Sequence, residues 1–222
     1  MNTGCARLVG IDDTEQGDTV DAAPPEDAGP VTANFQHGVD GYAGVEDTHL
    51  DDRSPTLNNG ANIEIIWEGD SADQFKRTGL LRFNALFSDS QGPIPVGASI
   101  IEATLYVEVS NASTDDPGEL REVLVPWAAA TVTWNTFGDS DGAGPKPEHY
   151  GDTILARLPM TAGAPEAIDV TSSVQAWAAD PTTNHGWILM GRGGALDAAG
   201  VHSSEAAESD KRPRLEVTWT GP

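Results

Sequence analysis

The sequence predicts an all-β fold: a jelly-roll-like antiparallel β-sandwich with one short helix, preceded by a disordered acidic tail. The first observation behind this prediction is a strand pattern at residues 100–109, in which apolar and polar side chains alternate. Side chains of a strand point alternately to its two faces, so one face suits a core and the other suits water. The apolar phase holds Ile101, Ala103, Leu105, Val107 and Val109, and the polar phase holds Glu102, Thr104, Tyr106 and Glu108.

The second observation is that shorter runs repeat this alternation between turn-forming segments. Apolar residues share one phase at 63–67, 81–83, 132–134 and 215–219, and Glu64 and Glu68 fall on the polar face of the first run. Turn formers such as Asn58-Asn59-Gly60 and Asp115-Asp116-Pro117-Gly118 lie between the runs. Residues 186–190 are apolar in both phases, which predicts a strand in the middle of a sheet. Many short strands divided by turns are typical of a sandwich or jelly roll.

The third observation is a single short helical pattern at residues 169–177. Val170, Val174 and Trp177 fall on one helical face, Thr171 or Ser172 can cap the start, and Asp180-Pro181 stops the helix. We expect this helix to form a lid over one open end of the sandwich. Trp177 should then plug the core and not form an exposed sugar-binding platform.

The N-terminal segment differs in composition from the rest of the chain. Residues 12–30 carry many acids, three prolines and no base, so they cannot bury enough apolar surface to offset the entropy of ordering. We therefore divide the chain into a disordered acidic linker at 1–30 and a sandwich domain at 31–222. Thr3-Gly4-Cys5 resembles the end of a bacterial lipoprotein signal, which makes Cys5 a candidate lipid-attachment site; the alternative is an incidental cysteine in a flexible tail.

The charge of the chain excludes several classes of partner. A formal net charge of −23 is unsuited to nucleic acid, which proteins bind through Lys and Arg, and equally unsuited to an anionic membrane surface. We expect membrane contact only through a lipid on Cys5. With one cysteine in the chain, an intramolecular disulfide is impossible.

Several stretches, read in order, resemble the DNRLRE domain, also grouped as carbohydrate-binding module family 96. They are Gly41-Tyr42-Ala43-Gly44-Val45-Glu46-Asp47-Thr48, Leu80-Leu81-Arg82-Phe83, Ile94-Pro95-Val96-Gly97-Ala98, Val132-Thr133-Trp134-Asn135, Asp169-Val170-Thr171, Asn184-His185-Gly186-Trp187, Ser203-Ser204-Glu205 and Arg212-Pro213-Arg214-Leu215-Glu216-Val217. The resemblance implies an extracellular, non-catalytic β-sandwich module on a secreted or surface protein. Some members of the family bind polysaccharides, alginate among them. Because this domain is acidic, a neutral glycan is easier to reconcile with it than an anionic one.

The sequence gives little support to catalysis. It has no Gly-x-Ser-x-Gly elbow, and its five histidines are scattered. The many carboxylates allow an acidic pair of the glycoside-hydrolase kind, but Glu102, Glu108 and Glu216 fall on polar strand faces, where a solvated carboxylate is ordinary. We expect no enzyme activity.

A calcium ion is the one cofactor that the sequence leaves open. Asp139-x-Asp141-Gly142 resembles the start of an oxygen-ligand loop, although the downstream bidentate acid is missing, and Asp70 and Asp73 form a second acidic loop. An acidic turn without a metal is the commoner case, so we expect no cofactor, with structural calcium as the alternative.

For a ligand site the sequence offers Tyr106, the aromatic residue on a polar strand face. Arg82 and Arg214 occupy the polar faces of their own strands, so the three form a shallow groove if their strands share a sheet. The alternative is an exposed tyrosine with two solvated arginines. His149-Tyr150 is a second candidate at a sandwich edge, whereas we expect core positions for Trp67, Trp134, Trp187 and Trp219.

These observations predict a monomeric, non-catalytic, extracellular carbohydrate-binding-type module on a cell-surface protein. The alternative is a structural or adhesive surface protein that acts through protein contacts.

Overall fold

The computed structural model describes residues 29–69, 75–112, 118–158, 163, 165–192 and 198–221. Within them lie eleven strands and a single α-helix, and the strands pair antiparallel throughout, which confirms the predicted fold class. The elements are β1 (Val31–Gln36), β2 (Val45–Asp51), β3 (Glu64–Gly69), β4 (Phe75–Phe83), η1 (Ser88–Ser90), β5 (Ser99–Asn111), β6 (Gly118–Glu122), η2 (Trp134–Thr136), η3 (Pro147–His149), β7 (Ala156–Leu158), β8 (Pro165–Asp169), α1 (Thr171–Ala179), η4 (Pro181–Thr183), β9 (Trp187–Gly191), β10 (Ala199–His202), η5 (Ser209–Lys211) and β11 (Arg214–Thr220).

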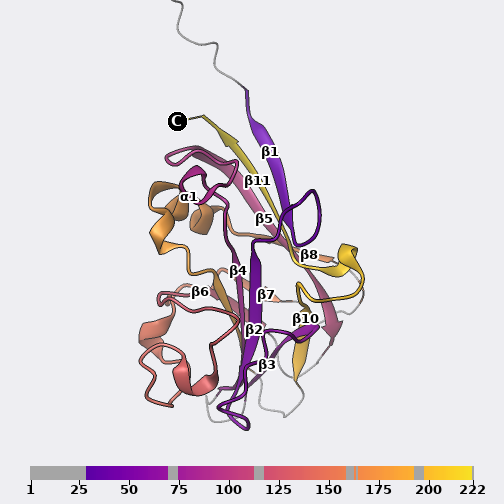
Figure 1. The fold of residues 1–222 in the computed structure, drawn as a ribbon, viewed down its shortest axis with the longest axis vertical. Helices are drawn as coiled ribbons and strands as arrows, with labels where there is room; N and C mark the ends of the chain where they lie inside the picture. Colours follow the sequence, from indigo (N-terminus) through magenta and orange to yellow (C-terminus); the bar gives the residue numbers. More distant parts are fainter. Residues whose placement is uncertain are drawn as a thin grey trace, which may run out of the picture.

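The strands form two facing layers whose hydrogen bonding is continuous (Figure 1). One layer holds β1, β11, β5 and β8, and the other holds β2, β4, β9, β6 and β7. Strands β10 and β3 connect β5 of the first layer to β4 of the second. The two layers enclose one main core, in which Leu105, Val107 and Leu215 of the first pack with Leu81 and Phe83 of the second.

The alternation in β5 and β11 is confirmed over most of their length, with one correction. Leu105, Leu215 and their neighbours in phase are buried, but Ile101 is 51 % exposed and Ile100 is buried in its place. Between Thr218 and Trp219 the pairing skips one residue of β5. This bulge shifts the phase of β5, because an extra residue turns every side chain beyond it to the other face.

The run at 63–67 is confirmed in part. Ile65 and Trp67 are buried, but Ile63 precedes β3 and is largely exposed. Glu68, expected in water, is buried because its Oε2 accepts a hydrogen bond of 2.5 Å from Arg53 Nη2 and lies 3.6 Å from Arg77 Nη1. Carboxylates are rarely buried unless paired, and here two guanidinium groups supply the pairing.

A long segment, residues 123–150, covers the outer face of the second layer (Figure 1). Its apolar side chains pack on Leu80, Ile188 and Met190, which explains why β9 is buried on both faces, as its sequence predicts. The predicted strand at 132–134 is wrong: Trp134 begins the 3-10 helix η2 and is half-buried. Hydrogen bonds between the Thr133 and Thr136 side chains and backbone stabilise this turn, and a run of so few residues does not separate the two structures.

Helix α1 lies at one end of the sandwich against β5, as predicted, and Trp177 is buried with its ring centroid 4.9 Å from that of Trp187. Its start differs from the prediction. The Thr171 N–H donates to Asp169 Oδ1 at 2.9 Å, so a carboxylate two residues earlier takes the role expected of Thr171 or Ser172. The Thr171 hydroxyl instead accepts from the Ala103 N–H and ties the helix to β5.

None of the helices in the described part of the chain is long and apolar enough to cross a bilayer. The predictions for Cys5, for the acidic segment up to residue 28, and for Asp70 and Asp73 concern positions outside the described residues.

Candidate functional site

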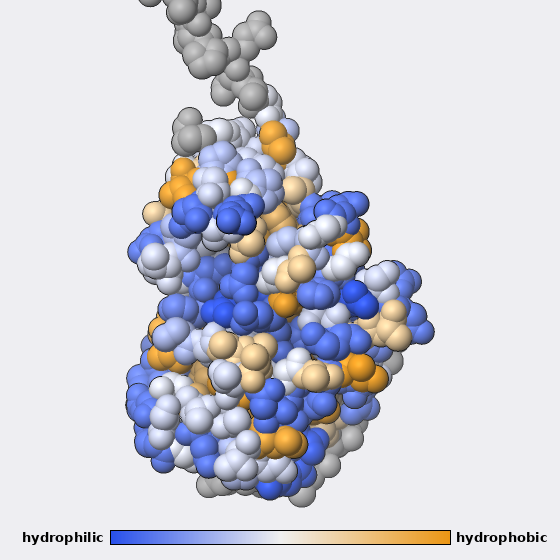
Figure 2. Space-filling model, in the orientation of Figure 1, coloured by the Kyte–Doolittle hydropathy of each residue, from blue (hydrophilic) through white to orange (hydrophobic). Residues whose placement is uncertain are grey.

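A pocket of about 490 Å³ opens at one edge of the sandwich, between the loop that joins β1 to β2 and the loop that follows β4. Its volume lies within the range of about 300–1,000 Å³ that is typical of small-molecule sites. The lining residues are Ala33, Asn34, Phe35, Asp40, Gly41, Tyr42, Ala43, Gly44, Ala85, Ser90, Gln91 and Pro93. Viewed as a surface, the molecule is hollowed across the middle of the face that carries β2, and hydrophilic residues gather there (Figure 2).

Two hydrogen bonds join the loops on either side of this pocket. The Tyr42 hydroxyl donates to the Asn84 carbonyl at 2.6 Å, and the Asn84 N–H donates to the Gly44 carbonyl at 2.7 Å. Burial raises the pKa of Tyr42 above its usual value, so its hydroxyl keeps the proton that it donates. The pocket is therefore held in one shape without a ligand, which lowers the entropy lost on binding.

Gly44 makes this close approach possible. A Cβ atom at this position would lie 2.5 Å from the Asn84 carbonyl oxygen and 2.7 Å from the Tyr42 hydroxyl. Contacts this short do not occur in folded proteins, so a side chain here would separate the two loops. Glycine is the residue that allows such an approach of backbone to backbone.

Backbone strain is concentrated around the pocket. Four described residues other than glycine have a left-handed backbone conformation, and three of them line it: Asp40 (φ 49°), Ala85 (φ 52°) and Gln91 (φ 71°). Such conformations are unfavourable for L-residues and tend to cluster at ligand sites, where the surrounding structure holds them.

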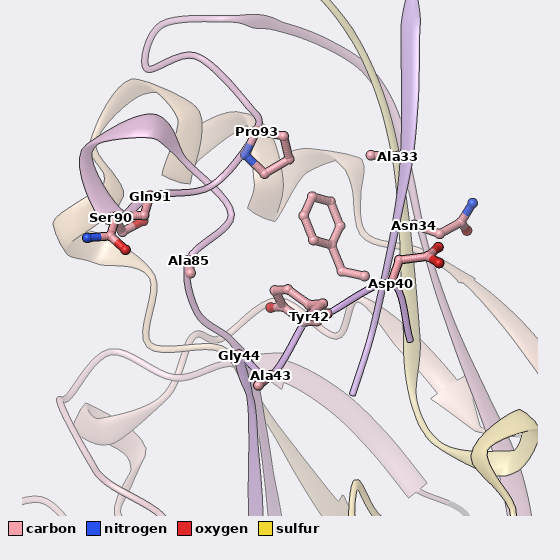
Figure 3. A pocket seen from close by; sticks show the side chains of 12 residues that line it. Ala33, Asn34, Asp40, Tyr42, Ala43, Gly44, Ala85, Ser90, Gln91 and Pro93 are labelled. Carbon is pink, nitrogen blue, oxygen red and sulfur yellow. The ribbon is translucent and has the colours of Figure 1, made fainter. Parts of the chain in front are cut away.

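The centre of the pocket is apolar and its rim is polar. Tyr42 and Pro93 lie on two sides of the lining, and Ala85, Ser90 and Gln91 lie on a third (Figure 3). In this view Asn34 and Asp40 point away from the space between Tyr42 and Pro93. Two aromatic rings hold Tyr42: the ring of Phe35 meets it edge-on at 5.2 Å between centroids, and the ring of Phe83 is stacked at 6.5 Å.

This arrangement suits a molecule with apolar faces and hydroxyl edges. Aromatic and proline rings pack against the C–H face of a sugar, while amide and hydroxyl groups on the rim exchange hydrogen bonds with its hydroxyls. The lining carries one carboxylate, that of Asp40, and no Lys, Arg or His. The described lining therefore offers no cationic side chain to an anionic group.

The structure brings together two of the three residues predicted to bind ligand. Tyr106 and Arg214 are direct cross-strand partners on β5 and β11, and the Arg214 guanidinium lies 3.8 Å from the Tyr106 ring centroid. Arg214 Nη1 also donates to Asn34 Oδ1 and to Glu216 Oε2. The exposed face of the tyrosine ring is thus covered by an arginine, and the adjoining cavity measures only about 60 Å³.

Arg82 lies elsewhere. Its neighbours Leu81 and Phe83 share a core with Leu105, so Arg82 and Tyr106 project outward from opposite layers. Arg82 Nη2 donates to Glu46 Oε2 at 2.6 Å, and its guanidinium stacks 4.9 Å from the Trp127 ring. The three predicted residues therefore do not form one groove.

A family model for carbohydrate-binding module family 96 matches residues 40–219. The chain belongs to this family. The match confirms the family resemblance seen in the sequence, and its span contains most of the pocket described above. No curated protein matches the chain.

The second predicted site of this family 96 module, His149-Tyr150, is buried. The His149 ring meets Phe137 edge-on at 5.6 Å, and Tyr150 packs beneath the guanidinium of Arg121 at 5.9 Å. Both residues belong to the segment that covers the second layer, so neither offers a face to a ligand.

The acidic loop proposed for calcium holds an internal cation. Lys146 Nζ donates to Asp139 Oδ2 at 2.8 Å and to Asp141 Oδ2, and these hydrogen bonds raise the pKa of the lysine. Asp139, Glu148 and His149 also place one potential ligand atom each within 4.8 Å of one another. However, His149 Nδ1 accepts from the Lys146 N–H, so Nε2 carries the proton and has no lone pair to give a metal.

Sequence reasoning missed the pocket, although the signal was present. Tyr42 stands between small residues in Gly41-Tyr42-Ala43-Gly44, the first stretch that resembles the family. An aromatic residue among glycines, outside any alternating run, indicates a loop position in which the backbone approaches another segment closely.

Proposed function

We propose that this family 96 module is a non-catalytic binding protein that holds a neutral glycan in the pocket between residues 33–44 and 85–93. The observation that carries the proposal is the preformed pocket itself, with an aromatic and proline centre and hydrogen-bonding groups on its rim. Membership of a carbohydrate-binding family supports the class of ligand. The acidic charge of the chain and the lack of bases in the pocket lining support a neutral sugar.

The test uses one substitution at three exposed alanines. Ala43 lines the pocket, Ala167 lies directly across from Tyr106 on β8, and Ala130 belongs to the segment over the second layer and lines neither site. Ala43→Arg should fill the pocket, Ala167→Arg should crowd the Tyr106–Arg214 pair, and Ala130→Arg serves as the control. Because each of the three side chains is exposed in the folded chain, we expect all three variants to keep the thermal stability of the parent.

The full chain and the three variants are applied to a glycan array that carries neutral glucans, mannans, xylans and galactans beside uronate polymers. We expect the parent, Ala130→Arg and Ala167→Arg to bind neutral glycans. Ala43→Arg should not bind them. Binding lost in Ala167→Arg but kept in Ala43→Arg would place the site at Tyr106 and Arg214. If no glycan binds, the proposed function is wrong. The alternative, a structural or adhesive protein that acts through protein contacts, is then tested by measuring self-association with light scattering.

We also propose that the module acts outside the cell and is attached through a lipid on Cys5. The Thr3-Gly4-Cys5 pattern and the acidic, proline-containing stretch that follows it support this arrangement. Mass spectrometry of the native protein tests it. A diacylglycerol on Cys5 is the expected result, and an unmodified cysteine in membrane-free culture medium contradicts it.

A further inference from the structure

Three depressions lie side by side and share residues. The pocket at Tyr42 shares Ala85 and Ser90 with a second depression of about 200 Å³, which is also lined by Asn84, Phe87, Asp89, Pro181, Thr182 and Asn184. That depression shares Thr182 with a third, of about 520 Å³, lined by Glu122, Val123, Leu124, Ala176, Trp177, Thr182, Thr183 and His185. Each depression thus adjoins the next through shared lining residues of the 84–90 loop and the η4 turn, and we name the three together the long groove.

Apolar side chains and small polar groups alternate along the lining of the long groove. Apolar surfaces recur along it, from Tyr42 and Pro93 through Pro181 to Leu124, whose side chain is 52 % exposed. Small polar groups, among them the hydroxyls of Ser90 and Thr182, stand between these surfaces. A repeated sequence of apolar patch and hydroxyl partner fits a polymer of pyranose rings, each of which has an apolar face and polar edges.

The charge of the long groove points to an uncharged polymer. Asp40, Asp89 and Glu122 line it, and no Lys or Arg is among its lining residues. Burial and the nearby Arg82 lower the pKa of His185, which favours its neutral form. A uronate or sulfate chain would find no lysine or arginine among these lining residues to pair with, whereas a neutral chain needs no such partner.

Hydrogen bonds also hold the middle and the far end of the long groove. Asn184 Nδ2 donates to the Phe83 carbonyl at 2.8 Å, and Trp127 Nε1 donates to the His185 carbonyl at 2.8 Å. The Asp180 carboxylate accepts from the Thr182 N–H at 3.1 Å and closes the η4 turn. A groove with fixed walls binds a chain that is already extended at little cost in ordering.

We propose that the long groove binds an internal segment of a neutral polysaccharide chain, so that sugar units occupy the far depression as well as the pocket at Tyr42. This inference rests on the proposed glycan-binding function and deepens it. It implies that affinity grows with chain length and that the module prefers a polymer to its terminal sugars.

Calorimetry on the full chain tests the proposal with four neutral series: cello-, manno-, xylo- and malto-oligosaccharides, each from the trisaccharide to the octasaccharide. In a series that binds, we expect the octasaccharide to bind about tenfold more tightly than the trisaccharide, a difference of about 1.4 kcal/mol. Leu124→Arg should block the far depression and bring the octasaccharide to the affinity of the trisaccharide. Leu57→Arg is the matched control, because Leu57 is 55 % exposed and lies outside the long groove.

The possible outcomes separate this inference from the function on which it rests. If the trisaccharide and octasaccharide bind equally and Leu124→Arg changes neither affinity, the long groove is wrong and the pocket at Tyr42 stands alone. If no member of the four series binds, the proposed function and the long groove both fall. Equal losses in Leu124→Arg and Leu57→Arg also overturn the inference, because the effect would then not belong to the far depression.

Discussion

Asp47→Asn should remove the part of the pH dependence of stability that Asp47 itself contributes in the weakly acidic range. Asp47 lies on β2, is 2 % exposed, and accepts a hydrogen bond from the Ser204 N–H at 2.8 Å. Burial and the adjacent negative charge of Glu205 raise the pKa of Asp47 to about 7. The carboxyl group is therefore protonated in the folded chain over a range in which an unfolded aspartate is ionised.

The sign and size of the effect follow from proton linkage. An unfolded aspartate has a pKa of about 3.9, so between about pH 4 and pH 7 the unfolded chain binds fewer protons at this site than the folded chain. The free energy of unfolding then falls as pH rises through this window. The difference between the two pKa values corresponds to a stabilisation of about 4 kcal/mol, which is fully present below about pH 4 and lost above about pH 7.

An asparagine at this position carries no charge at any pH and keeps a carbonyl oxygen to accept from Ser204. At pH 8 we expect Asp47→Asn to be more stable than the parent by up to about 4 kcal/mol, and at pH 4 the two should be equal. Urea unfolding followed by tryptophan fluorescence at pH 4, 6 and 8 measures this. Asp210→Asn, at an exposed site, is the control and should leave the pH profile unchanged. A variant that is less stable than the parent at pH 8 would refute the reasoning.

Three further predictions concern the pocket, the acidic loop and the core. Gly44→Ala should separate the two pocket loops, because its Cβ would lie 2.5 Å from a backbone oxygen; a lower melting temperature and lost glycan binding are expected, and unchanged binding contradicts this. Chelation by EDTA should leave the melting temperature unchanged, because the ammonium of Lys146 already pairs with both Asp139 and Asp141; a marked decrease would indicate a bound ion. Trp177→Ala should lower the free energy of unfolding by about 3–5 kcal/mol, measured in urea, and a loss below 1 kcal/mol would show that the helix lid does not depend on this side chain.

The fold could be predicted because burial in a two-layer sheet imposes a period of two on the sequence. Leu105 and Leu215 fall in the buried phase for that reason, and the polar phase correctly placed Tyr106 and Arg214 on one outer face. The prediction failed for Ile101, where a bulge opposite β11 shifts the phase. A bulge depends on the pairing of strands that are distant in sequence, and local alternation does not reveal it.

The candidate site was harder to predict because loops distant in the sequence build it. Tyr42 and Pro93 lie on different loops and line one pocket only after β2 has paired with β4 (Figure 3). A polar strand face, by contrast, is visible in the sequence as a local alternation of polar and apolar residues, and this alternation is the reason that Tyr106 was predicted to bind a ligand. That pattern shows which way a side chain points, but it does not show that Arg214 covers the ring.

The most direct test of the account is a titration of the isotopically labelled full chain with a neutral oligosaccharide, followed by backbone amide chemical shifts. Binding in the pocket predicts shifts confined to residues 40–44 and 85–93, with the 181–185 turn joining them for longer chains. Shifts centred on Tyr106, Ala167 and Arg214, with the amides around Tyr42 unmoved, would contradict it.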